Sequence, residues 1–251
     1  MKTFRTVFIT GASSGIGAAL ARYYINAGAT VGVGGRDAGR VADVCGAGAN
    51  ALPLIFETTD AGAAKTAVEG FVRQAGSIDL AILNAGTHEP TDAAEFSASR
   101  YARLMDVNYV GTLNCLEPVI AAMRAQGRGM IAITGSVAGY KGLPRAGAYC
   151  ASKAAMMRLA ETLRTELAPL NIDVKLISPG FVRTPLTDKN DFAMPFLMDV
   201  DEARDIIVRG LTRKGYQIVF PQRLAWGLRL LSALPAPIYF AITEKMLSAA
   251  R

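Results

Sequence analysis

The feature that most constrains the fold is an alternation of short apolar runs with longer helical stretches. Residues 4–10 form an apolar run rich in β-branched side chains, residues 15–27 have helical spacing, and residues 30–35 form a second apolar run. The later segments continue this alternation, with apolar runs at 51–56, 79–83, 130–135, 172–178 and 217–220 and helices at about 60–74 and 148–168. Such strand–helix–strand units predict a parallel sheet.

We therefore expect an α/β fold, a doubly wound parallel sheet of the Rossmann type with about seven strands and helices on both faces. Nearly continuous apolar strands are typical of sheets covered on both sides. The 251 residues, 51% of them hydrophobic, suffice for one domain with a large core. We expect residues 1–220 to form the catalytic domain, with cofactor and substrate sites together, and residues 221–251 to be an apolar helical extension of it. Functional residues should follow the strands directly, because ligands bind outside the carboxyl ends of such strands.

Composition argues against several other classes of protein. The net charge is +6, but Lys and Arg form no dense basic block, so we expect no nucleic-acid partner. The three cysteines, Cys45, Cys115 and Cys150, form no CxxC pair, and His88 is the single histidine, so we expect neither disulfides nor a metal site. The chain runs from Met1 into a strand-like segment without the apolar region of a signal peptide, which predicts a cytoplasmic location.

A glycine-rich turn directly follows the first expected strand and leads into a helix. Its glycines permit a tight turn and close approach of a ligand to the backbone. The start of the helix offers free N–H groups and the positive end of its dipole, which suits a pyrophosphate. The turn therefore predicts a phosphate cradle, with a plain strand-to-helix turn as the alternative. The candidate cofactor-binding residues are Gly11, Ser13, Ser14, Gly15, Ile16 and Gly17.

The end of the second strand predicts which nicotinamide cofactor is bound. An enzyme that uses NAD is expected to place an acid here for the ribose 2′-hydroxyl, whereas this chain has two glycines and Arg36. The guanidinium of Arg36 suits bidentate pairing with a 2′-phosphate, and Ser13 could add a hydrogen bond. We therefore expect NADP(H) to be preferred over NAD(H). Arg40 or Arg22 could take the place of Arg36.

Tyr149 and Lys153 lie four residues apart, on one face of an expected helix. A free tyrosine has a pKa of about 10, too high for a base at neutral pH. A lysine ammonium at about 4 Å would favour the phenolate by about 4 kcal/mol at an effective dielectric near 20, or about three pKa units. We therefore expect Lys153 to lower the pKa of Tyr149, which would act as general acid and base.

The order of these motifs resembles the short-chain dehydrogenase/reductase family. The resemblance spans roughly residues 4–185, from the glycine turn through Asn84-Ala85-Gly86 to Pro179-Gly180. It implies an oxidoreductase that interconverts a ketone or aldehyde and an alcohol. The tetrad that it implies consists of Asn108, Ser136, Tyr149 and Lys153.

Each member of this tetrad has a role in the family. Tyr149 would exchange a proton with the substrate oxygen while the nicotinamide exchanges a hydride. Ser136 would hydrogen-bond that oxygen as a preorganised donor. Lys153 would hold the nicotinamide ribose, and Asn108 would anchor a water that relays protons from Lys153.

The resemblance also implies contacts with the cofactor. The backbone of Ser14 and Ile16 would bind the pyrophosphate, and Gly17 would allow close helix packing. Glu57, followed by Thr58, stands where the family usually has an Asp that contacts adenine, so either adenine binding or a surface role is open. The further residues expected at the adenosine ribose and the nicotinamide are Asn84, Ala85, Gly86, Tyr149, Lys153, Pro179, Gly180, Val182 and Thr184.

Several segments bear on the substrate. Residues 185–201 mix methionines and a phenylalanine with charged residues and resemble the variable lid of the family, which favours an apolar or bulky substrate. Tyr140, Leu143 and Pro144 are candidate pocket walls, with a structural turn as the alternative. His88 follows Asn84-Ala85-Gly86, where the loop could overhang the active site, but we expect it to be a surface loop residue.

The apolar residues of segment 221–251 depart from the short glycine-rich end that is common in the family. The 14 residues between Arg229 and Glu244, which include Pro235 and Pro237, are too few to span a membrane. Three interpretations stay open for this segment: a helical cap on the fold or across a dimer, part of the substrate mouth, or an amphipathic anchor with peripheral membrane contact. The resemblance implies a homodimer or homotetramer.

Two other functions fit the sequence less well. A nucleotide sensor or scaffold without catalysis would be expected to have a broken tetrad, whereas all four residues are present. A sugar epimerase shares the Tyr-x3-Lys pair but is disfavoured by the short chain and by the spacing of Gly11, Gly15 and Gly17.

Overall fold

The computed structural model describes residues 4–189 and 194–249. Seven parallel strands form one sheet in the order β3-β2-β1-β4-β5-β6-β7, which confirms the doubly wound α/β class. Each expected apolar run overlaps one of them to within one residue at its ends or contains it. They are β1 (Thr6–Thr10), β2 (Thr30–Gly35), β3 (Ala51–Ile55), β4 (Leu80–Leu83), β5 (Gly129–Thr134), β6 (Ile172–Pro179) and β7 (Gln217–Phe220).

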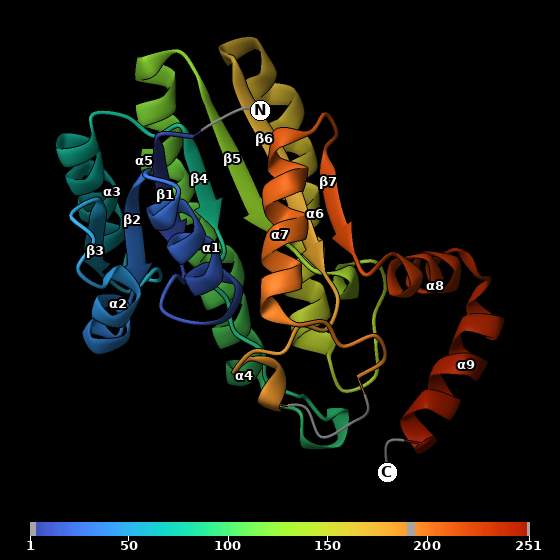
Figure 1. Cartoon of the computed structure of the whole chain (residues 1–251). Helices are drawn as coiled ribbons and strands as arrows, with labels where there is room; N and C mark the ends of the chain where they lie inside the picture. Colours follow the sequence, from blue (N-terminus) through green and yellow to red (C-terminus); the bar gives the residue numbers. More distant parts are fainter. Residues whose placement is uncertain (1–3, 190–193, 250–251) are drawn as a thin grey trace.

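Helices cover both faces of the sheet (Figure 1). One face packs against α1 (Gly15–Asn26), α2 (Ala38–Cys45) and α7 (Val200–Thr212), and the other against α3 (Ala61–Ala75), α5 (Gly111–Gln126) and α6 (Gly147–Leu167). Apolar side chains at helical spacing make these contacts. Leu20 and Ile207 are fully buried in the first layer, as are Val119 and Ala160 in the second. The two layers leave the carboxyl ends of the strands open for function.

Successive strands are added on one side of β1 up to β3 and on its other side from β4 onward, and open sheets of this kind form a crevice at such a switch point between β1 and β4. The hydroxyl of Thr10, the last residue of β1, accepts hydrogen bonds from the backbone N–H groups of Asn84 and Ala85, both at 3.0 Å. One side chain therefore fixes the turn after β4 to the turn after β1.

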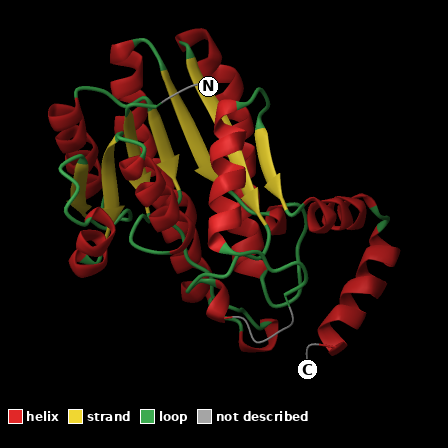
Figure 2. Cartoon of the chain, in the orientation of Figure 1, coloured by secondary structure: helices red, strands yellow, loops and turns green. Residues whose placement is uncertain are grey.

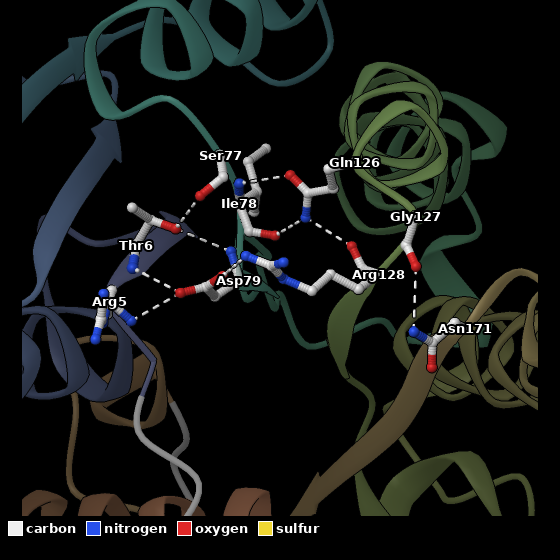
Figure 3. Close-up of polar contacts among 9 residues, drawn as sticks. All are labelled: Arg5, Thr6, Ser77, Ile78, Asp79, Gln126, Gly127, Arg128 and Asn171. Atoms are coloured by element: carbon white, nitrogen blue, oxygen red, sulfur yellow. Dashed lines mark hydrogen bonds and ion pairs between the residues drawn. The ribbon is translucent and has the colours of Figure 1, made fainter.

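A polar network joins the opposite, amino ends of the central strands (Figure 3). The Asp79 carboxylate accepts from the backbone N–H of Arg5 at 2.9 Å, and the Thr6 hydroxyl accepts from the N–H of Asp79 at 3.0 Å. The Gln126 amide accepts from the N–H of Ile78 at 3.1 Å and donates to the carbonyls of Ile78 and Arg128, both at 2.6 Å. These contacts hold the start of β4 against β1 and the end of α5.

Two helices follow β7 at the end where the strands finish (Figure 2). They are α8 (Gln222–Ala233) and α9 (Ala236–Ala249), and in Figure 1 α9 stands apart from the body of the fold. Ala225 and Leu231 bury one side of α8, whereas Trp226 is 65% exposed and Leu230 is 68% exposed. Within residues 4–189 and 194–249, no helix is long and apolar enough to cross a membrane.

Candidate active site

A cavity of about 1240 Å³ lies at the carboxyl ends of the strands. Every predicted site residue lines this cavity except Gly17 and Asn108, which are buried and do not line it. The predicted residues on the wall are Gly11, Ser13, Ser14, Gly15, Ile16, Arg36, Glu57, Thr58, Asn84, Ala85, Gly86, Ser136, Tyr149, Lys153, Pro179, Gly180, Val182 and Thr184. Residues from across the sequence therefore meet in one place, because the strands that precede them are parallel.

The glycine turn has the geometry of a cradle. Gly11 and Gly15 have φ angles of 62° and 52°, a region that side chains disfavour. A Cβ atom on Gly17 would lie 2.2 Å from the Gly11 carbonyl oxygen and 2.7 Å from the Asn84 amide nitrogen. Only a glycine lets α1 approach the turn this closely. Ser14 precedes α1, so the free N–H groups of its first turn are beside the cavity. The turn fits a dinucleotide pyrophosphate.

Arg36 is on the cavity wall, and its guanidinium forms an ion pair with the Glu57 carboxylate at 3.2 Å. The Arg36 side chain is 73% exposed and free to reorient. Ser13 packs against the backbone of Gly35, next to Arg36. The alternatives Arg22 and Arg40 line a second cavity of about 400 Å³ instead. Of the three arginines, Arg36 is the one on the wall of the larger cavity, whereas the cavity of Arg22 and Arg40 shares Ser13, Ser14 and Gly15 with it.

Thr58 is buried on the wall, next to Glu57. Its carbonyl accepts from the Asn114 side chain at 2.9 Å, and its hydroxyl lies against Gly111, where a Cβ atom would be 2.7 Å away. These contacts fix the segment after β3 to the start of α5. Thr184 packs against the glycine turn from the other side, 3.0 Å from the Cβ position of Gly15. The expected nicotinamide segment therefore adjoins the expected phosphate cradle.

Asn108 lies in a π-helical turn, Asp106–Val110, between α4 (Ala98–Met105) and α5. Its side chain is fully buried: the amide oxygen accepts from the N–H of Thr87 at 2.7 Å, and the amide nitrogen donates to the Thr87 carbonyl at 3.0 Å and the Ser152 hydroxyl at 2.9 Å. π-Helical turns inside helices are frequent at functional sites. Here the turn directs Asn108 toward the loop after β4 and toward α6.

Ser136, Tyr149 and Lys153 meet where β5 and α6 approach each other. The Ser136 hydroxyl donates to the Pro179 carbonyl at 3.3 Å and lies close enough to Tyr149 to lower the pKa of its phenol by hydrogen bonding. The Lys153 Nζ donates to the Thr134 carbonyl at 3.0 Å and lies 5.7 Å from the centre of the Tyr149 ring. Gly86 covers Lys153, because a Cβ atom there would lie 3.5 Å from Nζ. A hydroxyl pair with a buried ammonium behind it can bind an oxygen atom and supply it with a proton.

Burial is the largest cause of the pKa shifts of Tyr149 and Lys153. It raises the pKa of Tyr149 to about 12, although the hydrogen bond with Ser136 acts in the opposite direction. It also lowers the pKa of Lys153 to about 8. The expected net lowering of the Tyr149 pKa is not found: burial raises this pKa, and the Lys153 ammonium donates to the Thr134 carbonyl. Tyr149 carries its proton at neutral pH.

His88 is the residue most clearly misjudged from the sequence. We expected a surface position, but His88 is 8% exposed, and its ring meets the Tyr149 ring edge to face at 4.8 Å between centroids. It comes two residues after Gly86, so the loop that follows β4 turns inward over α6. Its place in the loop after β4, two residues beyond Asn84-Ala85-Gly86, was the signal that could have identified it.

Some of the residues expected to contact the substrate line the cavity, whereas others contact neighbouring elements of the fold. Leu143 and Pro144 line the cavity. Tyr140 does not belong to the described wall; its hydroxyl accepts from Gln217 at 3.0 Å, and the Arg229 guanidinium lies 5.3 Å from its ring centre. In the expected lid, residues 185–187 and Pro195 line the cavity, whereas residues 190–193 lie outside the described residues.

The C-terminal helices also reach the cavity. Leu224 and Leu228 of α8 and Met246 of α9 are part of its wall. Of the three interpretations left open by the sequence, part of the substrate mouth is the one that this contact favours. Among the described residues, no group of three or more His, Cys, Asp or Glu side chains could hold a metal ion.

Comparisons with known proteins match this architecture. The model of the short chain dehydrogenase family matches residues 5–194. An uncharacterized oxidoreductase of Myxococcus xanthus is 33% identical over 248 residues, which are 97% of this chain and 98% of that protein. An 11-beta-hydroxysteroid dehydrogenase-like protein of Arabidopsis thaliana is 29% identical over 97% of this chain and 82% of its own length.

A solved structure of a short chain dehydrogenase is also similar to this chain. The crystal structure of a short chain dehydrogenase from Burkholderia cenocepacia in complex with NADP is similar with a TM-score of 0.78 and 29% identity. The similarity covers 89% of this chain and 92% of that one.

Proposed function

Because this chain belongs to the short-chain dehydrogenase/reductase family and is an NAD(P)-dependent oxidoreductase, we propose that Tyr149 is its general acid and base. The substrate is a ketone or aldehyde, or the corresponding alcohol. The observation that carries this proposal is the meeting of Ser136, Tyr149 and Lys153 on the wall of the cavity that also contains the glycine turn.

The chain's own residues handle the substrate oxygen. The bound nicotinamide cofactor supplies or accepts the hydride. Ser136 donates a hydrogen bond to the carbonyl oxygen and so stabilises the negative charge that develops on it. Tyr149, protonated at neutral pH, gives its proton to that oxygen. Lys153 then returns a proton to the Tyr149 oxygen, while Asn108 holds the loop after β4 in place.

NADP(H) is the preferred cofactor in this proposal. The glycine turn would hold the pyrophosphate, and Arg36 with Ser13 would hold the 2′-phosphate. Arg36 must leave Glu57 to do so, and the 73% exposure of its side chain supports such a movement. The related Burkholderia cenocepacia protein, which binds NADP, adds support.

An apolar or bulky substrate is supported by the apolar part of the wall, which includes Leu143, Leu224 and Leu228. The name of the Arabidopsis relative points in the same direction. We assign the reacting groups and the cofactor contacts to residues 1–220 and treat residues 221–251 as an extension that completes the substrate site.

The test is the absorbance of the reduced nicotinamide with NADPH and with NADH, against carbonyl compounds from small ketones to steroid-like ketones. We expect NADPH to be preferred, and Tyr149→Phe to lower kcat by about 10²-fold to 10⁴-fold because the proton donor is lost. Arg36→Ala should weaken the binding of NADPH by about tenfold to 100-fold, since a hydrogen bond to a charged group contributes about 1.5–3 kcal/mol. The binding of NADH should be nearly unchanged.

Three results would contradict parts of the proposal. Full activity in Tyr149→Phe would exclude the assigned general acid. Tight cofactor binding without turnover of any carbonyl compound would favour a nucleotide sensor, and a preference for NADH would remove the role of Arg36.

A further inference from the structure

The apolar part of the cavity is built by segments that are far apart in the sequence. Leu224 and Leu228 are one turn apart on α8 and share a face of that helix. Leu224 packs against the turn after β6, because a Cβ atom on Gly180 would lie 2.7 Å from its Cδ2 atom. Met246 comes from α9, and Leu143 comes from the loop before α6. The wall therefore continues from the expected nicotinamide segment out to the C-terminal helices.

Polar contacts fix these helices beside the loop that leads to Tyr149. The Arg229 guanidinium donates to the Gln217 side chain at 2.7 Å. The Lys141 ammonium donates to the Ser232 carbonyl at 3.3 Å and lies 5.0 Å from the centre of the Tyr239 ring. The Tyr239 hydroxyl donates to the Gly142 carbonyl. The positions of α8 and of the first part of α9 are thus set by residues 140–142, which precede the reacting tyrosine.

The size of the cavity leaves room for more than a cofactor. Sites for small molecules commonly have volumes of about 300–1,000 Å³, whereas this cavity has about 1240 Å³. Leu224 and Leu228 are partly buried, and Met246 is 45% exposed at the edge. Covering apolar side chains that are still partly exposed to water with an apolar ligand lowers the free energy, because their surface is removed from water.

We propose that Leu224, Leu228 and Met246 form a binding site for an extended apolar group of the substrate, such as an alkyl chain or a fused ring system. This site rests on the proposed function, since the carbonyl end of the same substrate would lie at Ser136 and Tyr149. It gives α8 and α9 a role in selecting the substrate without any part in proton transfer.

The test uses a homologous series of straight-chain aldehydes and methyl ketones with NADPH, compared as kcat/KM. Each further methylene group that the site buries should raise kcat/KM by about fourfold, the value that corresponds to about 0.8 kcal/mol per buried methylene. Leu228→Gln and Met246→Gln should flatten this dependence on chain length by lowering kcat/KM most for the longest substrates.

Each variant has a matched control on its own helix. Leu230→Gln on α8 and Ile242→Gln on α9 alter exposed apolar residues outside the described cavity wall, and both should retain the chain-length dependence of the wild type. Equal slopes in Leu228→Gln and Leu230→Gln, with turnover of short substrates intact, would overturn the site and leave the proposed function standing. Absence of turnover with every carbonyl compound in the wild type would refute the proposed function itself.

Discussion

Replacing Lys153 with methionine should stabilise the folded protein while it removes activity. Lys153 is 4% exposed, and burial lowers its pKa from 10.5 to about 8. A difference of about 2.5 pKa units corresponds to about 3 kcal/mol, the free energy by which the fold disfavours the ammonium at neutral pH. Losing the hydrogen bond to the Thr134 carbonyl offsets about 1 kcal/mol of this gain. Lys153→Met should therefore raise the free energy of unfolding by about 2 kcal/mol at pH 7.

The effect should depend on pH in a defined direction. Between pH 8 and 10.5 the unfolded chain keeps the Lys153 proton and the folded protein releases it, so the wild type becomes more stable relative to Lys153→Met as the pH rises. The advantage of the variant should be complete below pH 8 and absent above about pH 10.5. Urea denaturation of both proteins without added nucleotide, at several pH values from 7 to 11, measures this difference.

Lys175 provides the control. It is 2% exposed, but its ammonium donates to the carbonyls of Gly210, Arg213 and Gly215 at 3.2, 2.7 and 2.8 Å. Lys175→Met leaves these acceptors without their donor and should lower stability by about 1–3 kcal/mol or more. If Lys153→Met is less stable than the wild type at pH 7, or if its effect does not change with pH, the argument from burial is wrong.

Three further substitutions test the site and its support. Gly17→Ala places a Cβ atom 2.2 Å from the Gly11 carbonyl oxygen, so calorimetry should show at least tenfold weaker NADPH binding, and unaltered binding would contradict the assigned cradle. Gln126→Met removes three hydrogen bonds at the amino ends of the strands and should lower the free energy of unfolding by about 1–3 kcal/mol. The KM for NADPH should not change. A changed KM would show that this network affects the site. Asn108→Leu leaves the N–H of Thr87 without its acceptor, so hydrogen exchange at Thr87 should accelerate, and unchanged exchange would argue against a positioning role.

The strands and the order of motifs could be predicted from the sequence because they depend on local patterns. Every expected apolar run coincides closely with a strand of the sheet, since continuous β-branched runs have few alternatives in a covered parallel sheet. The candidate site residues share one edge because parallel strands end there. The sequence did not indicate the π-helical turn at Asn108, which depends on how α5 packs beneath the loop after β4.

Burial explains what could not be predicted. His88 lies in a segment whose sequence is typical of a loop, and only the path of the folded chain places its ring against Tyr149. The pKa of Tyr149 rises rather than falls because the cost of desolvation depends on neighbours from several segments. The C-terminal helices were expected as an apolar extension, but their contact with the cavity depends on Arg229, Lys141 and Tyr239, whose partners are distant in sequence.

The exposed tryptophan on α8 gives the protein an optical reporter of its own. Trp226 is the single tryptophan of the chain, so light absorbed selectively by indole is emitted from this helix alone. Its side chain is 65% exposed, and the Arg229 guanidinium lies 5.7 Å from its ring, so the emission should be that of an indole in water and should be quenched by soluble iodide. Any molecule that covers α8 should shift the emission to shorter wavelength and protect it from the quencher. Occupation of this surface can therefore be followed in unlabelled protein.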